Sequence, residues 1–211
     1  TNFYIPQNSD HPEHVAGTIA GAGNINPTYR GMAPKAKILA DYFNAIQDDV
    51  PSFYPAYNMV LTSNSWGSTS GCSSKGIYTS SSASIDQQMR DYAKVLHVFA
   101  ASNDGGNNCA PYTAGYHTIG SNENCAKNVL TVGALTSADV IASFSSRGPC
   151  NDGRIKPEVS AVGVNVTSTV RTNTYSVKSG TSMATPGTSG TIALLIQRYR
   201  QLHGNADADA A

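Results

Sequence analysis

Short apolar runs alternate with polar stretches along most of this chain. Between two of these runs, Ile85, Met89 and Tyr92 recur at helical spacing within residues 82–95, behind serines that can cap a helix. A strand, a helix and a strand in this order predict parallel pairing through a right-handed crossover. The runs that are typical of buried strands are residues 35–43, 58–65, 95–102 and 127–135.

A second helical pattern lies near the end of the chain. Residues 182–204 are small or apolar on most sides and become basic at Arg198 and Arg200. This predicts a largely buried helix with a favourable charge at its C-terminal end. No Pro/Gly-rich linker divides the chain, so residues 1–211 are expected to form one α/β domain with a mostly parallel sheet.

The composition narrows the classes of partner. Charged residues make up 13% of the sequence and the formal net charge is zero, which points away from nucleic acid and anionic membranes. No apolar run approaches the roughly 20 residues of a membrane span. Little Lys and Glu, with abundant Ser, Thr, Gly and Asn and with 11 Tyr, favour a secreted or cell-surface protein.

The four cysteines are widely spaced and form no C-x-x-C pair of the kind that binds zinc or cycles as a dithiol. An even number of cysteines in a Ser/Thr-rich chain favours two disulfides, and the alternative is four buried thiols in a reducing compartment. The residues concerned are Cys72, Cys109, Cys125 and Cys150.

Three polar features follow the ends of extended segments, where parallel sheets bind ligands. Residues 95–102 lead into Asn103 and two glycines, and residues 58–65 lead into Trp66 and a glycine. Ser182 stands where an extended segment turns into a helix, whose N-terminus favours nearby negative charge. A reactive serine also needs a base within hydrogen-bond reach and a group that orients the base.

His11 is the strongest candidate for that base. It begins a helix that Ser9 and Asp10 can cap and that Pro12 suits as a first helical residue, so its imidazole projects from the rim of the scaffold. The other histidines fit a strand, a polar loop, a helix end and a helix interior: His97, His117, His203 and His14.

Four motifs in order, "HPEHVAGTIAG", "FAASNDG", "SFSSRGP" and "GTSMATP", resemble those of the subtilisin-like serine proteases, the subtilases. The likeness extends along nearly the whole chain. It implies a three-layer fold, in which helices flank the sheet, and a serine endopeptidase. It further implies that Ser182 is the nucleophile, His11 the general base and acid, and Asn103 the side-chain donor of an oxyanion hole.

The same resemblance implies a substrate groove and a pairing of the cysteines. "SNSWG" and residues 100–102 are expected to flank the P1 side chain and to pair with the substrate backbone. The pairing implied is Cys72 with Cys109 and Cys125 with Cys150. No cofactor is expected to take part in the chemistry, and structural calcium is allowed but not located. The expected substrate-binding residues are Ser65, Trp66, Gly67, Ala100, Ala101 and Ser102.

Near His11 the sequence departs from the family pattern, because Pro12-Glu13 replaces the common Gly-Thr. A carboxylate close to the imidazole would raise the pKa of His11, whereas one that points to solvent would have little effect on it. A zinc site is also suggested by the two histidines His11 and His14 with Glu13 between them. The spacing is not H-E-x-x-H, however, and no third ligand is evident.

The family's orienting aspartate is the second departure. It ends the first strand in an Asp-Ser/Thr-Gly motif, and only ten residues precede His11 here. Asp10 adjoins His11 and cannot reach around to its ring, while Asp41 comes too late in the order. We therefore expect the first strand to be absent from this chain and a separate upstream segment to supply the catalytic Asp. The alternative is a catalytically silent subtilase-like module that binds peptides.

Overall fold

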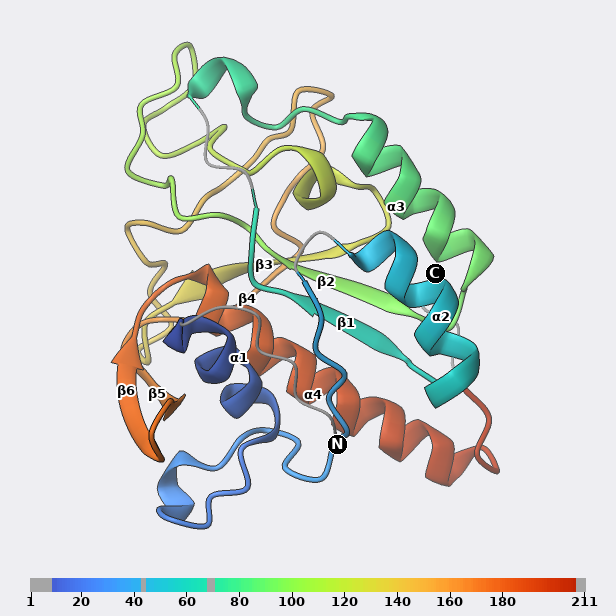
Figure 1. Ribbon diagram of the computed structural model, residues 1–211. Helices are drawn as coiled ribbons and strands as arrows, with labels where there is room; N and C mark the ends of the chain where they lie inside the picture. The colour runs from blue at the N-terminus through green and yellow to red at the C-terminus, as the bar shows by residue number, and fades with distance from the viewer. Residues whose placement is uncertain (1–8, 43–44, 68–70, 208–211) are drawn as a thin grey trace.

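A four-stranded parallel sheet lies at the centre of the molecule (Figure 1). The computed structural model describes residues 9–42, 45–67 and 71–207. Sequential strands lie side by side, which confirms the predicted parallel pairing through crossovers. In sheet order the strands are β1 (Leu61–Asn64), β2 (Leu96–Ala100), β3 (Leu130–Leu135) and β4 (Val159–Val162).

Helices cover both faces of this sheet and complete the expected three layers (Figure 1). Neighbouring residues of β2 point to opposite faces, so that Phe99 packs with Ile85 on one side and Val98 with Ala184 on the other. The first face is covered by α2 (Ile46–Tyr57) and α3 (Ser80–Asp91), and the second by α4 (Thr181–Leu202) with α1 (Asp10–Ala20) packed on α4.

An antiparallel hairpin lies beside α1 and leads into α4. It consists of β5 (Val166–Val170) and β6 (Thr174–Lys178). α1 approaches β5 so closely that a Cβ at Gly17 would overlap the Thr169 hydroxyl. Three short 3₁₀ helices occupy connections, namely η1 (Pro27–Tyr29), η2 (Cys72–Ser74) and η3 (Asn122–Cys125).

The strand predicted over residues 35–43 is wrong for its described part, because residues 35–42 form no strand. A strand must hydrogen-bond to a neighbouring strand, and residues 35–42 have no such neighbour among the described residues. Among the described residues, β1 is an edge of the sheet and pairs with β2 alone. Residues 35–42 therefore lack the pairing that makes a strand.

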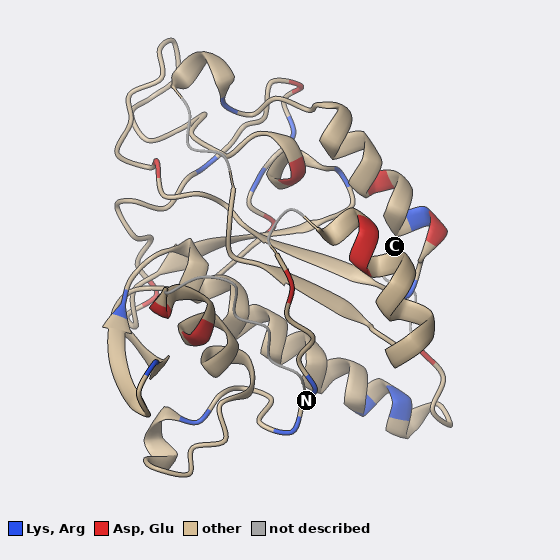
Figure 2. Cartoon of the chain, in the orientation of Figure 1, with Lys and Arg blue, Asp and Glu red and all other residues tan. Residues whose placement is uncertain are grey.

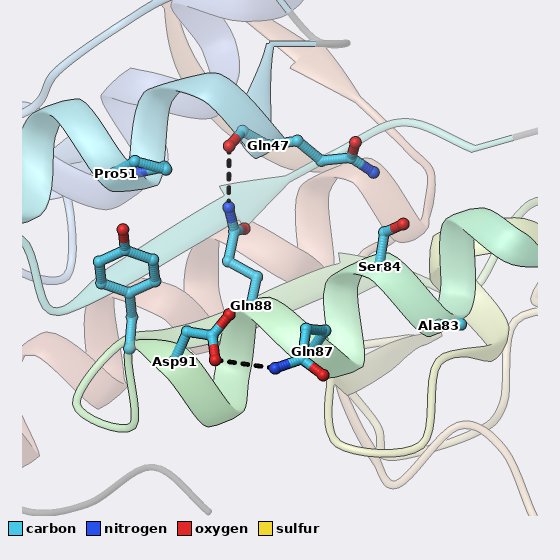
Figure 3. A pocket seen from close by; sticks show the side chains of 8 residues that line it. Gln47, Pro51, Ala83, Ser84, Gln87, Gln88 and Asp91 are labelled. Carbon is cyan, nitrogen blue, oxygen red and sulfur yellow. Dashed lines mark hydrogen bonds between the residues drawn. The ribbon is translucent and has the colours of Figure 1, made fainter.

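Helix α2 was not predicted, because Pro51 and Pro55 stand inside it. Proline lacks an N–H, so Pro51 leaves the Gln47 carbonyl four residues earlier without its helical partner. The side chain of Gln88 on α3 donates from Nε2 to that carbonyl at 3.0 Å (Figure 3). A hydrogen bond between α2 and α3 thus satisfies the carbonyl that Pro51 leaves free. Local helix propensity alone does not include this compensation.

Charged side chains are sparse and spread over separate elements (Figure 2). Lysine and arginine occur on the last turns of α4, on the hairpin and in loops, interspersed with the acidic residues. None of the described helices is long and apolar enough to cross a bilayer.

Candidate active site

Ser182 is placed by a sharp turn from the hairpin into α4. Gly180 occupies the N-cap of α4 with φ 157° and ψ 161°, a conformation that L side chains rarely adopt. Its N–H donates to the Gly163 carbonyl at 2.8 Å, which ties the turn to the end of β4. Ser182 is then the second residue of α4, where unpaired backbone N–H groups and the helix dipole favour negative charge.

A proline in α4 links Ser182 to the strand end opposite. Pro186 has no N–H to donate to the Ser182 carbonyl. That carbonyl instead accepts a hydrogen bond from Ser65 Oγ at 2.9 Å. Ser182 Oγ in turn donates to the Ser65 carbonyl at 3.2 Å. The two serines therefore exchange two hydrogen bonds, and the segment after β1 is held against the first turn of α4.

Asn103 presents its amide nitrogen beside Ser182. The Asn103 Oδ1 accepts from the Thr181 N–H at 2.9 Å and from the Thr181 hydroxyl at 3.1 Å. Because both bonds use the oxygen, Nδ2 points away from Thr181 and remains a free donor among the described contacts. Such a donor can stabilise negative charge on an oxygen near Ser182.

These groups surround a pocket of about 140 Å³ between the ends of β1 and β2. Ala101 does not line it, because the alternation along the chain buries Ala101 beside Ile119 and Cys125. Ser65 acts through its bonds to Ser182 and does not line the pocket either. Sequence reasoning missed Thr181, which directly precedes the nucleophile candidate and orients Asn103. The lining residues are Trp66, Gly67, Ala100, Ser102, Asn103, Thr181 and Ser182.

His11 lies in the first turn of α1, where the Ser9 side chain accepts its N–H at 3.3 Å. Burial lowers the pKa of His11 below its ordinary value, and the charges of Lys178 and His14 lower it further. The imidazole is therefore neutral at pH 7 and able to accept a proton. Neither of its ring nitrogens hydrogen-bonds a described residue; Ser182 Oγ donates to Ser65 rather than to His11.

The comparisons with known proteins agree with this geometry. A model described as the Subtilase family matches residues 4–208. The chain belongs to the subtilase family. Subtilisin DY from Bacillus licheniformis is 32% identical over 203 residues, which cover 94% of this chain and 68% of that relative. A thermostable alkaline protease from Halalkalibacterium halodurans is 34% identical over 94% of this chain and 50% of its own length.

A solved protease shares the fold. The CspB protease of Clostridium perfringens superposes with a TM-score of 0.76 over 94% of this chain and 71% of its own, at 17% identity. That identity supports the architecture alone. The curated relatives above are longer than the present chain, which spans between half and about two thirds of their length.

Of the two cases left open for Glu13, the one in which it raises the pKa of His11 does not hold in this subtilase. The shift in the pKa of His11 is downward and comes from burial, Lys178 and His14, with no contribution from Glu13. Asp10 is also turned away from the imidazole, because its Oδ1 accepts from Arg171 Nε at 3.0 Å. In the part of the chain that the structure describes, no carboxylate hydrogen-bonds the His11 ring.

Cys72 and Cys109 form the expected disulfide, which joins η2 to the loop after Asn103. The second expected disulfide is not formed, and Cys125 and Cys150 are buried thiols. Their sulfurs lie 3.2 Å apart, well beyond the roughly 2.05 Å of a disulfide bond, and the Cys125 thiol also donates to the Gly120 carbonyl at 3.0 Å. The hydrogen bond between the two thiols raises the pKa of Cys125, and burial raises it further.

A second and larger cavity, of about 490 Å³, lies between α2 and α3 (Figure 3). Its lining includes three glutamines and Asp91, and none of the predicted site residues contributes to it. Among the described residues, no group of three or more His, Cys, Asp or Glu could hold a metal ion. Of the predicted catalytic residues, Ser182 and Asn103 line the smaller pocket, and His11 does not.

Proposed function

We propose that this protein is a subtilisin-like serine endopeptidase in which Ser182 is the nucleophile. The observation that carries the proposal is the convergence of Ser182, at the N-terminus of α4, and the free amide donor of Asn103 on one pocket. Membership of the subtilase family supports the reaction class. The substrate is a peptide or protein whose P1 side chain enters this pocket.

The proposed reaction uses Ser182, His11, Asn103 and water. Ser182 Oγ attacks the peptide carbonyl while His11 takes its proton, and the Asn103 amide and the Ser182 N–H stabilise the oxyanion. His11 passes the proton to the leaving amine, so the C–N bond breaks and an acyl-enzyme remains. Water then hydrolyses the ester through the same two residues in reverse. Substrate backbone pairs with residues 65–67 and 100–102 as an added strand.

A fluorophosphonate probe tests the assignment of Ser182. Covalent labelling of the folded protein should be lost in Ser182→Ala and retained in Ser179→Ala, which removes a hydroxyl three residues away. Labelling that persists in Ser182→Ala would remove Ser182 from its role. Ser179 is a matched control because its hydroxyl is used in a turn, where it accepts from the Asn165 N–H.

We further propose that a separate upstream segment supplies the carboxylate that orients His11. Two features support this proposal. No described carboxylate contacts the imidazole, and the outer edge of β1 has no strand partner among the described residues. A segment that pairs with β1 as a strand would deliver an aspartate at the carboxyl end of the sheet, where Ser182 and the pocket lie.

A synthetic strand with an Asp-Ser/Thr-Gly end tests that step. Loss of the triad aspartate costs a subtilisin roughly 10⁴ in turnover, so the added peptide should raise turnover and the labelling rate of Ser182 strongly. The same peptide with Asn in place of Asp is the matched control and should bind without activating. No activation at a saturating concentration of the aspartate peptide would refute the proposal.

The competing function is a catalytically silent module that binds peptides. The exchange of hydrogen bonds between Ser65 and Ser182 favours it, because the nucleophile candidate donates to a carbonyl and not to a base. In that case Ser182 should react with the fluorophosphonate no faster than free serine, with or without the aspartate peptide, while peptides still bind the pocket.

We also propose that the protein is secreted or displayed at the cell surface. The Cys72–Cys109 disulfide supports this location, since disulfides persist mainly in oxidising compartments. Mass analysis of peptides from the non-reduced protein, isolated from its native source, should recover these two cysteines joined.

A further inference from the structure

Asn124 lies directly behind the pocket, although no motif draws attention to it. It belongs to η3 and is fully buried. Its backbone is fixed, because the Thr131 hydroxyl donates to the Asn124 carbonyl at 3.0 Å. The side chain is thus held at a defined place and does not sample the surface.

The amide of Asn124 bridges the two walls of the pocket. The ladder between β1 and β2 ends where Asn64 lies opposite Phe99, and the pocket opens between the segments that follow. Asn124 Nδ2 donates to the Ala100 carbonyl at 2.5 Å on one wall and to the Trp66 carbonyl at 3.4 Å on the other. The Asn124 amide therefore closes the pocket at its inner end.

The oxygen of the same amide fills the space behind two glycines. A Cβ added to Gly67, which lines the pocket, would stand 2.8 Å from Asn124 Oδ1, and one added to Gly120 would stand 3.1 Å from it. Oδ1 is buried and accepts no hydrogen bond from the described residues. Leaving an acceptor unpaired costs on the order of 1–3 kcal/mol. Hydrogen bonding of Oδ1 therefore does not explain why this residue is an asparagine. The closure of the pocket by the side chain does explain it.

We propose that Asn124 sets the depth of the P1 pocket and restricts the P1 residue to side chains no larger than leucine. This proposal rests on the proposed function, in which the pocket receives P1. A cavity of about 150 Å³ is filled by one benzene molecule. The present pocket, at about 140 Å³, has no room for a tyrosine ring with its hydroxyl and Cβ.

The test measures binding, so that it does not depend on turnover. Trp66 lines the pocket and is the only tryptophan of the sequence, which makes its fluorescence a site-specific signal. In a Ser182→Ala background, acetylated Ala-Ala-Ala-Leu and Ala-Ala-Ala-Tyr with free carboxyl ends are titrated, with excitation at the red edge of the tryptophan band where tyrosine does not absorb. The parent protein should bind the leucine peptide at least tenfold more tightly, since even one methylene in such a pocket changes discrimination by about 10–200-fold.

Two substitutions separate depth from hydrogen bonding. Asn124→Ala should open the crevice and shift the ratio of the two dissociation constants by at least tenfold toward the tyrosine peptide. Asn124→Leu is the matched control, because it keeps a side chain of similar size without the amide, and it should keep the preference for leucine.

Three results would overturn the proposal. One is equal binding of both peptides by the parent protein, which needs no variant. Another is an unchanged ratio in a folded Asn124→Ala. The third is that neither peptide perturbs Trp66. Failure of fluorophosphonate labelling with an intact preference for leucine would instead refute the peptidase and leave the role of Asn124 standing.

Discussion

Asn103 commits its amide oxygen to Thr181 and keeps its amide nitrogen for the pocket. Asn103→Leu should therefore lower kcat by roughly 10²–10³, or about 2.7–4 kcal/mol, and leave KM nearly unchanged, because the donor acts on charge that develops only in the transition state. Initial rates over a range of peptide concentrations measure both constants. Asn107→Leu, in the same exposed loop, serves as the control and should behave as the parent protein; a loss in Asn103→Leu that resides in KM would contradict the assignment.

The pKa of His11 is held low by burial and by the nearby positive charge of Lys178. Because the base must be neutral, the labelling rate of Ser182 should rise with pH, and the midpoint of this rise should lie below the ordinary histidine pKa of about 6.5. Lys178→Gln removes the like charge, so the rising limb should move to higher pH. Lys178→Arg keeps the charge and should leave the limb in place. Identical profiles for the two variants would show that the charge of Lys178 does not reach His11.

At the scale of elements, Pro51 in α2 and Pro186 in α4 each free a carbonyl four residues earlier. In both helices the freed carbonyl accepts a side chain from a neighbouring element: Gln88 reaches Gln47, and Ser65 reaches Ser182. The sequence shows the prolines but not their compensation, which is why α2 escaped prediction. In α4 the long small and apolar pattern outweighed the single Pro186, and the predicted helix is confirmed within a residue or two at each end.

Two crosslinks join the segment around η2 to the loop that follows Asn103, and only one of them is covalent. Besides the disulfide, the fully buried Lys75 pairs with Asp104, whose side chain is 19% exposed and also accepts from the Ser102 hydroxyl at 2.8 Å. Ser102 itself has φ 91°, a strained conformation for a serine, at the turn that presents Asn103. The ion pair therefore helps to hold the oxyanion donor in position.

Removing Asp104 should lower the free energy of unfolding more than removing Lys75. Asp104→Ala should lower the free energy of unfolding by about 3–5 kcal/mol, because it leaves a buried ammonium without a partner. Lys75→Met should cost less, since Asp104 keeps the Ser102 hydroxyl and some contact with water. Urea unfolding of both variants measures the two costs, and a larger loss for Lys75→Met would contradict the argument.

On the scale of the whole molecule, acid should weaken the fold through His97 in the centre of the sheet. Burial lowers the pKa of His97 to about 4, below the value of about 6.5 expected in the unfolded chain. The unfolded state therefore binds the proton first as pH falls, so this contribution is complete above about pH 6.5 and is lost between pH 6.5 and 4. The loss should be on the order of 3 kcal/mol.

The measurement is the urea midpoint at pH 7 and at pH 4.5. His97→Leu should be less sensitive to acid than the parent protein, whereas His203→Gln, which alters an exposed histidine at the end of α4, should keep the full sensitivity. Equal acid sensitivity of His97→Leu and the parent protein would assign the loss to other groups.

Sequence reasoning gave the α/β class, the order of three strands and three helices, and the family. It identified Ser182 and Asn103, which the structure brings to one pocket, because their motifs lie where elements end. It could not find Thr181, Lys75 or Asn124, whose roles arise from contacts between distant segments and leave no local pattern. The strand expected over residues 35–43 failed in its described part, because it depends on a neighbouring strand whose position the sequence does not fix. The second disulfide was expected between two cysteines that do lie together, with sulfurs 3.2 Å apart, but the bond between them is not formed.

The outer edge of β1, which is unpaired among the described residues, also bears on how copies of this protein behave toward one another. Two molecules related by a twofold axis could join these edges as an antiparallel pair, which is the usual start of edge-to-edge aggregation. β1 is only four residues long, so such a pair would gain about four hydrogen bonds at roughly 1 kcal/mol each. That gain in free energy is smaller than the cost of the translational and rotational freedom lost on association. The shortness of β1 therefore disfavours edge-to-edge association, which a longer strand at this edge would favour.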